Sequence, residues 1–253
     1  MTAQLHVEDS GTPGPTVVLV HGLGGTTTFY DPIVPALTEH FRVLRFDLEG
    51  HGRSPLTCAV SIASFTRDLA ALIVARTDGH AHVVGHSMGT LVVQSLASTR
   101  PELVDSLVLL GPVRAQPDAA KEATRGRAAT VRTGGMTGVA ETVATNATSP
   151  TAGEANPLVF GTVRELLLGQ DPEGYASGCE ALAAAENPDL TSILSPVLLL
   201  TGEDDKVSPP ATSEAMATEL KDATVAVTPG CGHWTVTEAP SFVTDQVLAF
   251  LTS

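Results

Sequence analysis

The sequence predicts an α/β protein built on a mostly parallel, twisted sheet with helices on its two faces. Short apolar runs bounded by turn residues recur along the 253 residues, and segments with helical periodicity separate them. The runs are continuously apolar, which is typical of strands buried on both faces of a parallel sheet. The alternation of strand and helix favours a doubly wound architecture.

The expected strands are short, and each ends at residues that are typical of turns. The first run, VVLV at 17–20, ends at His21-Gly22, and the last run ends before Pro229-Gly230. Glycine and proline end strands because they suit a sharp change in backbone direction. The runs lie at 17–20, 42–46, 82–84, 106–110, 196–200 and 224–227.

Helical patterns follow several of these strands. In the clearest pattern, Ile62, Phe65 and Leu69 recur at helical spacing and share one stripe with Leu72 and Ile73. A stripe of this kind packs one side of a helix against the sheet. The expected helices of the core lie at 61–76, 88–98, 209–220 and 238–251.

One long interval, 113–190, contains no run of the strand type. It consists of short helical patterns divided by glycine and proline, and it is too long for a simple loop. We therefore expect a helical lid over the carboxyl edge of the sheet, inserted into a core formed by 1–112 and 191–253. The expected helices of this insertion lie at 118–132, 138–145, 157–168 and 172–186.

Composition and charge limit the classes of partner. Hydrophobic residues make up 43% of the chain, and 28 acidic against 14 basic residues give a net charge of −14. An acidic chain without basic runs disfavours nucleic acid and anionic membranes, and no apolar stretch approaches the ~18 residues of a membrane span. The N-terminus lacks a secretory pattern and the three cysteines form no C-x-x-C pair. We expect a cytoplasmic monomer or homodimer with reduced thiols.

The most specific motif is Gly85-His86-Ser87-Met88-Gly89, which follows an expected strand and precedes an expected helix. It matches G-x-S-x-G, in which the serine occupies a strained turn with its oxygen at the sheet edge. The two glycines allow close packing around the turn, and the helix N-terminus favours developing negative charge. The serine could instead be an ordinary helix cap, but its position between strand and helix favours a nucleophile.

A serine hydroxyl needs a base within hydrogen-bonding distance to act as a nucleophile at neutral pH. His233 is the expected base, because it lies in the loop Gly230-Cys231-Gly232-His233-Trp234 after the last strand. That loop should reach the same sheet edge as Ser87. The alternative is that His233 is one of eight histidines without a catalytic role.

The base needs a carboxylate that orients it, and three carboxylates compete for this role. Glu203, Asp204 and Asp205 follow Gly202 at the end of the preceding strand. We favour Asp205, three residues past the glycine, with Asp204 as the alternative. We expect the two aspartate side chains to diverge, because two close carboxylates would raise the pKa of one of them.

Two backbone N–H groups are expected to bind the oxyanion of the tetrahedral intermediate. One is that of Met88, directly after the nucleophile. The other is that of Leu23, in the glycine-rich loop after the first strand. A dinucleotide-binding loop is disfavoured there, because Thr27 stands where G-x-G-x-x-G requires a glycine.

Other polar residues are assigned structural roles. Asp47 and Arg53, in the polar turn after the second strand, are expected to hold loops near the site, and His86 is expected to pack below the nucleophile. The remaining histidines and cysteines show no metal-ligand spacing. We therefore expect neither a metal nor a cofactor.

The order of these motifs resembles that of the α/β-hydrolase superfamily. H-G-x-G-G after a strand, D-x-x-G-H-G-x-S, G-H-S-M-G, G-x-x-D and G-x-G-H-W follow one another over essentially the whole chain. The resemblance implies the α/β-hydrolase fold, a triad of Ser87, His233 and Asp205, and an oxyanion hole at Leu23 and Met88.

The insertion is similar to that of 3-oxoadipate enol-lactonase-like members, through 131–136 and 171–176 with 179–182. That family hydrolyses a small enol-lactone bearing a carboxylate. Thr90 stands where a glycine is common, and 141–150 lacks the bulky aromatic residues that line the family's pocket. The resemblance therefore carries the reaction class to this chain but not the specific substrate.

These patterns predict a serine hydrolase that cleaves a small carboxylic ester or lactone in a roomy, weakly aromatic pocket. Arg125 and Arg132 share a helix face and either could bind a substrate carboxylate, although a solvated face is the alternative. The expected substrate-binding residues are Gly22, Arg125, Arg132, Met136, Leu158, Phe160, Leu182 and Trp234.

Two other functions are compatible with the same motifs. One is a different reaction on the same scaffold, such as C–C hydrolysis, hydroxynitrile cleavage or perhydrolysis. The other is a ligand receptor that keeps the triad without turnover. Haloalkane and epoxide chemistry are disfavoured, because such members use an aspartate where Ser87 stands.

Overall fold

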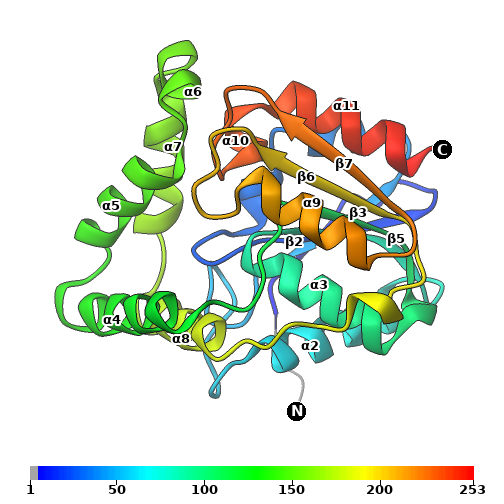
Figure 1. Ribbon diagram of the computed structural model, residues 1–253. Helices are drawn as coiled ribbons and strands as arrows, with labels where there is room; N and C mark the ends of the chain where they lie inside the picture. Colours follow the sequence, from blue (N-terminus) through cyan, green and yellow to red (C-terminus); the bar gives the residue numbers. More distant parts are fainter. Residues whose placement is uncertain (1–4) are drawn as a thin grey trace.

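A seven-stranded sheet forms the centre of the computed structural model, which describes residues 5–253 (Figure 1). The strands are β1 Val7–Asp9, β2 Thr16–Val20, β3 Arg42–Phe46, β4 Ala81–His86, β5 Val104–Leu110, β6 Val197–Gly202 and β7 Ala223–Thr228. Their order in the sheet is β1-β3-β2-β4-β5-β6-β7, and every pair is parallel except β1 with β3. The predicted strands and the mostly parallel sheet are confirmed.

Strand β1 was not expected from the sequence. It lies at the edge of the sheet and pairs antiparallel with β3, with Val7 opposite Phe46. Its three residues, VED, contain one apolar side chain and are not buried. A short, half-solvated edge strand therefore carries no continuous apolar run that could reveal it.

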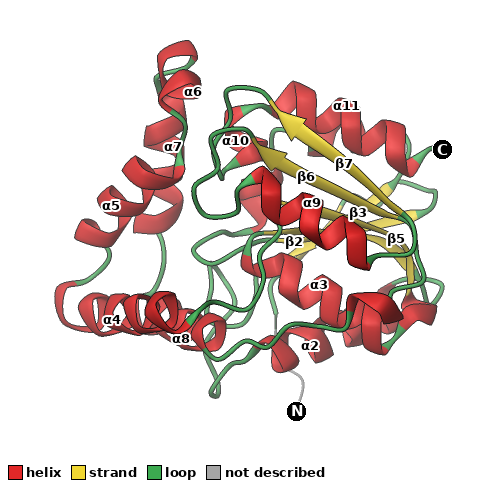
Figure 2. Ribbon diagram, in the orientation of Figure 1, coloured by secondary structure: helices red, strands yellow, loops and turns green. Residues whose placement is uncertain are grey.

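Helices cover both faces of the sheet (Figure 2). Those of the core are α1 Val34–Leu37, α2 Ile62–Arg76, α3 Met88–Thr99, α9 Pro210–Glu219, α10 Thr235–Glu238 and α11 Pro240–Leu251. Alternate residues of β2 enter the two layers: Val18 and Val20 pack with α2 and α3, whereas Val17 and Leu19 pack with α1 and α11. Burial on both faces explains why the strands read as continuous apolar runs.

Five helices lie between β5 and β6, in residues 113–190, which we call the insertion. They are α4 Asp118–Gly134, α5 Thr137–Ala147, α6 Pro150–Ala155, α7 Leu158–Leu168 and α8 Pro172–Ala183. Helix α4 packs along α8, and α5 packs along α7. Figure 1 shows the insertion in green to yellow, beside the carboxyl ends of β6 and β7. No helix within residues 5–253 is long and apolar enough to cross a membrane.

Helix α6 was also not expected from the sequence, in which Ser149-Pro150 indicates a break between helices. The Ser149 hydroxyl accepts a hydrogen bond from the N–H of Thr151, and Pro150 fills the first helical position. Proline suits this position because the N–H it lacks would have no partner inside the helix. The same two residues therefore end one helical segment and start the next.

Candidate active site

Ser87 occupies a strained turn between β4 and α3. Its backbone has φ 50° and ψ −120°, and it is the one residue other than glycine with a positive φ in the described part of the chain. Strain of this kind costs about 1–3 kcal/mol and persists only where the surroundings impose it. A Cβ atom on Gly85 would lie 2.8 Å from the carbonyl oxygen of Gly89, so the turn closes only with glycine at 85.

His233 and Asp205 meet Ser87 at the carboxyl edge of the sheet. His233 Nε2 lies 2.8 Å from Ser87 Oγ, and His233 Nδ1 lies 2.8 Å from Asp205 Oδ2. The side chains of His233 and Asp205 are 5% and 0% exposed, so water does not compete for this contact. The structure therefore brings together the three residues that the sequence placed in a triad.

Asp205 and Asp204 diverge as expected. The second oxygen of Asp205, Oδ1, accepts hydrogen bonds from the N–H groups of Val207 and Ser208, each at 2.8 Å. Asp204 instead accepts a hydrogen bond at 2.6 Å from the hydroxyl of Ser149, in the insertion. Only Asp205 faces the imidazole of His233, and its carboxylate is held by donors on both oxygens.

The glycine-rich loop after β2 lies beside the nucleophile. A Cβ atom on Gly22 would lie 2.8 Å from Ser87 Cβ, which places Leu23 next to the site. Among the hydrogen bonds within residues 5–253, none has the N–H of Leu23 or Met88 as donor. Both groups are therefore free of other hydrogen bonds in the described part of the chain.

His21 fixes the conformation of this loop. Its Nδ1 lies 2.8 Å from the carbonyl oxygen of Gly22, and its Nε2 accepts a hydrogen bond from the N–H of Leu48. These two contacts require the neutral tautomer protonated on Nδ1. Burial lowers the pKa of His21, which also favours the neutral ring.

The other polar residues predicted to be structural are found below and beside the site. His86 Nε2 contacts the carbonyl oxygen of His233 at 2.9 Å, and its ring packs against Phe29. Burial lowers the pKa of His86 well below its usual value. Asp47 accepts hydrogen bonds from the N–H groups of Thr27 and Arg53, so it joins two loops as expected.

Gly111 is a site residue that the sequence analysis did not single out. It follows β5 with φ +54°, and a Cβ atom there would lie 3.1 Å from two atoms of the His233 ring. The same atom would lie 3.4 Å from Asp205 Oδ2. The available signal was a glycine at the end of an apolar run. Gly85 and Gly202 stand in the same position shortly before Ser87 and Asp205.

A pocket of about 400 Å³ contains Ser87. Leu182, one of the residues expected to bind substrate, lines this pocket, and so does the continuous segment 112–117. Gly22 lies beside Ser87 but is not among the residues that line this pocket. The lining residues are Ser87, Pro112, Val113, Arg114, Ala115, Gln116, Pro117, Ala120, Leu182, Val207, Ser208 and Thr212.

The two arginines predicted to face the substrate do not line this pocket. Arg125 is exposed and contacts Glu122, and Arg132 forms ion pairs with Glu173 and Glu180 on the surface. Both residues share a face of α4 that points to solvent. The buried residues of this helix are Thr124, Ala128 and Val131, which lie on a different face. A residue directly after a buried position is turned by about 100° around the helix.

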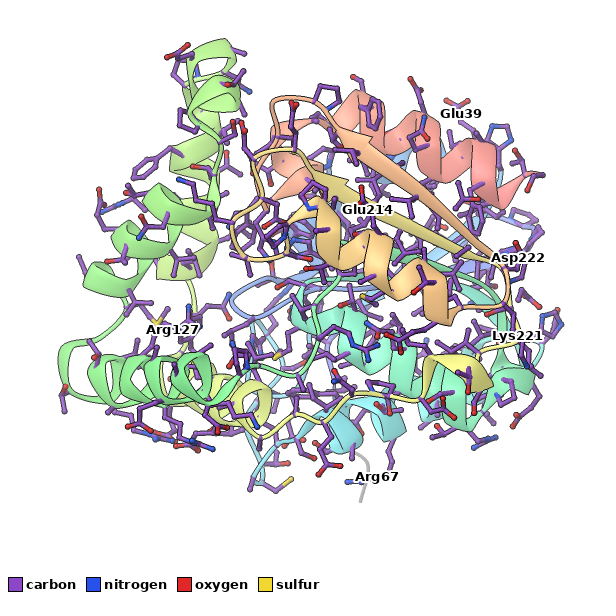
Figure 3. All side chains as sticks on the ribbon, viewed as in Figure 1. Glu39, Arg67, Arg127, Glu214, Lys221 and Asp222 are labelled. Carbon is purple, nitrogen blue, oxygen red and sulfur yellow. The ribbon has the colours of Figure 1, made fainter. Side chains whose placement is uncertain are left out.

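Arg127 is the half-buried arginine of α4 (Figure 3). It lies close to Tyr175 and Cys179 of α8, where its charge opposes the rise in the pKa of both groups that burial causes. It does not line the Ser87 pocket. The helix period therefore allowed a shared face to be recognised, but not the direction in which that face points.

Four apolar predictions also need correction. Met136 and Phe160 pack in the apolar layer between the insertion and the sheet, and Trp234 is buried against His86. Leu158 is 73% exposed and lines a separate apolar groove with Phe29. None of the four lines the Ser87 pocket.

The fold and the arrangement around Ser87 define an α/β hydrolase. A strand–serine–helix turn of the G-x-S-x-G type, with an aspartate and then a histidine later in the chain, is typical of this class. The chain belongs to the alpha/beta hydrolase family, whose sequence profile matches residues 17–246. No group of three or more His, Cys, Asp or Glu residues that could hold a metal ion occurs in the described range.

Solved structures and curated relatives agree with this class. An esterase from Thermogutta terrifontis, solved with malate bound, superposes with a TM-score of 0.94 and 29% identity, over 99% of this chain and 96% of that one. The enol-lactonase from Burkholderia xenovorans LB400 gives a TM-score of 0.93 and 29% identity, over 100% and 99%. The (E)-2-((N-methylformamido)methylene)succinate hydrolase of Acinetobacter baylyi is 28% identical over 254 residues, covering 99% of this chain and 94% of the relative. The expected likeness to enol-lactonases is confirmed.

Proposed function

We propose that this protein is a serine hydrolase that cleaves a small carboxylic ester or lactone through an acyl-enzyme on Ser87. The observation that carries the proposal is the continuous hydrogen-bonded chain from Ser87 Oγ through His233 to Asp205. Relatives named as an esterase and an enol-lactonase support the ester or lactone class.

In the proposed mechanism His233 acts first as a base. Asp205 accepts the Nδ1–H of His233, which leaves Nε2 unprotonated and facing the Ser87 hydroxyl. As Ser87 Oγ attacks the carbonyl carbon, its proton passes to Nε2, and Asp205 stabilises the imidazolium that results. His233 then gives this proton to the leaving alkoxide oxygen. A water molecule, deprotonated by the same nitrogen, then attacks the acyl carbon. The bond from this carbon to Ser87 Oγ breaks, Oγ takes the proton back from Nε2, and the acid is released.

The backbone stabilises the negative charge that develops on the carbonyl oxygen. The N–H groups of Leu23 and Met88 are the proposed donors, and donors of this kind contribute about 3 kcal/mol each to transition-state binding. Because they belong to the backbone, they are already oriented before the substrate arrives. Met88 also begins α3, whose N-terminus favours negative charge.

The pocket suggests a small substrate with a polar or anionic substituent. A volume of about 400 Å³ lies toward the lower end of the ~300–1,000 Å³ of ligand pockets. Arg114 lines this pocket; its Nη2 lies 3.5 Å from Glu219 Oε2, and its buried Nη1 has no hydrogen-bond partner within residues 5–253. A substrate carboxylate would supply that partner. We propose Arg114 for the role that the sequence assigned to Arg125 or Arg132, with the insertion as the lid that carries it.

Hydrolysis assays with p-nitrophenyl acetate and a panel of small lactones test this function. We expect repeated turnover by the wild-type protein and a loss of at least about 10³-fold in kcat for Ser87→Ala, with circular dichroism unchanged. Near-normal hydrolysis by Ser87→Ala would remove the assignment of the nucleophile. Release of a single equivalent of product without further turnover would instead identify a ligand receptor.

A further inference from the structure

We propose that Glu238 and the turn between α5 and α6 are positioning elements that hold His233 in line with Ser87. In this arrangement the insertion covers the site and also holds the imidazole of His233 in place. The inference rests on the proposed function, since it assigns roles around the same base. Neither Glu238 nor the turn, at Ala147, Thr148 and Ser149, would contact the substrate.

The carboxylate of Glu238 joins the two sides of the His233 loop. Its Oε1 accepts a hydrogen bond from the N–H of Trp234 at 2.9 Å, and its Oε2 accepts one from the N–H of Gly232 at 2.8 Å. The residues before and after His233 are thus tied to one side chain. A single carboxylate thereby fixes the direction in which the imidazole leaves the backbone.

The same carboxylate also reaches the insertion. Glu238 Oε2 accepts a further hydrogen bond from the N–H of Ser149 at 2.8 Å. In the opposite direction, the N–H of His233 donates to the carbonyl oxygen of Ala147 at 2.8 Å. The N–H of Ser149 and the carbonyl oxygen of Ala147 therefore bind Glu238 and His233 directly.

Asp204 forms a second connection between the insertion and the His233 loop. Its Oδ2 accepts a hydrogen bond from Ser149 Oγ at 2.6 Å, and its N–H donates to the carbonyl oxygen of Cys231 at 2.8 Å. This gives the aspartate that is not in the triad a role beside it. The acid loop, the base loop and the insertion meet at Ser149, which is 1% exposed.

The turn and the His233 loop are in backbone-to-backbone contact. A Cβ atom on Gly232 would lie 2.7 Å from the nitrogen of Ser149 and 2.9 Å from the oxygen of Ala147. Only glycine at 232 allows this approach. A shift of the turn would therefore be transmitted to His233, whose ring nitrogen needs its 2.8 Å contact with Ser87 Oγ.

The charge on Glu238 matters for this role. Burial raises the pKa of Glu238, whereas its three N–H donors and the nearby His233 favour the charged form. The other titratable groups around this loop are Glu203, Asp204, Asp205, His86, whose Nε2 contacts the carbonyl oxygen of His233, and the thiol of Cys231, whose pKa is raised by burial and by nearby carboxylates. A neutral side chain at 238 would accept fewer N–H groups and would no longer stabilise the imidazolium.

The test uses Glu238→Gln, which keeps the shape of the side chain but presents an amide NH₂ in place of one acceptor oxygen. We expect kcat for p-nitrophenyl acetate to fall about tenfold or more, with KM within about twofold, because a small misplacement of a catalytic group slows the chemical step. Glu214→Gln, on the outer side of α9 (Figure 3), is the matched control and should leave both constants unchanged. Unchanged kcat in a folded Glu238→Gln protein would overturn the proposal.

Ser149→Ala provides an independent arm if Glu238→Gln does not fold. It removes the hydroxyl that binds Asp204 but keeps the N–H that binds Glu238, and we expect a few-fold fall in kcat with unchanged KM. A fall in activity that only follows the folded fraction in either variant would show a purely structural role and would overturn the proposal.

A measurement without turnover separates this inference from the proposed function. The proton between His233 Nδ1 and Asp205 should give a downfield ¹H NMR signal in the wild-type protein, and this signal should broaden or shift in Glu238→Gln but not in Glu214→Gln. If the wild-type protein hydrolyses no ester or lactone but the signal responds in this way, the proposed function fails and the positioning role stands. An identical signal in all three proteins would overturn the positioning role.

Discussion

Gly111 and His233 are in contact at the point where β5 ends. The space that a side chain on Gly111 would fill is taken by the imidazole, which would lie 3.1 Å from a Cβ atom there. The glycine also has φ +54°, a conformation that residues with a side chain rarely adopt. The end of β5 thus contacts the imidazole of His233 and limits its position.

We expect Gly111→Ala to lower kcat at least about tenfold, because the methyl group would displace His233 from Ser87. The matched control is Gly11→Ala. Gly11 also has a positive φ, of +68°, but a Cβ atom there would meet no other atom within 4 Å. Steady-state kinetics and thermal unfolding of both variants separate displacement of the base from backbone strain. Equal loss of activity in the two variants would contradict the assignment.

Asp205→Asn and Asp204→Asn should differ sharply. The first removes the charge that orients His233 and stabilises its imidazolium, and we expect a loss of about 10²–10⁴-fold in kcat. The second weakens only the contact with Ser149, and we expect a loss of less than about tenfold. Measurement of kcat for both variants decides the acid, and the reverse order would assign Asp204 instead.

Arg114→Met should change substrate preference. We expect kcat/KM for a lactone or ester bearing a carboxylate to fall about tenfold or more, because one charge-assisted hydrogen bond is lost. The same constant for a neutral ester of similar size should change much less. Arg125→Met, which alters an exposed arginine of the insertion, is the control. An equal effect on charged and neutral substrates would argue against carboxylate binding by Arg114.

Acid should destabilise the protein through buried neutral histidines. Burial and the nearby His21 lower the pKa of His51 from 6.5 to about 3. Between these two values the unfolded chain binds the proton that the folded protein excludes, so the free energy of unfolding falls as the pH is lowered below 6.5. For His51 alone the loss at pH 5 is about 2 kcal/mol.

Urea unfolding at pH 6.5, 6.0, 5.5 and 5.0 measures this effect. His51→Gln, which cannot take up the proton, should lose about 1.6 kcal/mol less than the wild-type protein between pH 6.5 and 5.0. The buried His51 Nε2 has no hydrogen-bond partner in the described residues, so the substitution removes no contact at that nitrogen. Parallel pH dependences for the two proteins would show that His51 is not responsible.

The sheet and the meeting of Ser87, His233 and Asp205 could be predicted from the sequence because both are encoded locally. Each strand buried on both faces is a continuous apolar run, and each of these three residues follows such a run. Parallel strands place their carboxyl ends at one edge, so residues that follow strands meet there even when they are far apart in the chain. This is why the positions of Ser87, Asp205 and His233 along the chain were enough to predict that they meet.

The pocket could not be read in the same way, as the residues of the insertion show. Arg125 and Arg132 share a helix face, but the face points to solvent because Thr124, Ala128 and Val131 pack inward. Leu158 is apolar and exposed, whereas Met136 is apolar and packed away from the pocket. Helical periodicity gives the relative angle of two residues but not the absolute direction of either.

The sequence by itself therefore determined the α/β class, the order of strands and helices along the chain and the three residues, Ser87, Asp205 and His233, that meet at the sheet edge. Only the tertiary structure decided that Arg114 lines the Ser87 pocket, that Gly111 backs His233, and that Glu238 ties the base loop to Ser149. The physical reason is that strand burial and turn geometry depend on neighbours along the chain, whereas contacts between the insertion and the core depend on how separate helices pack.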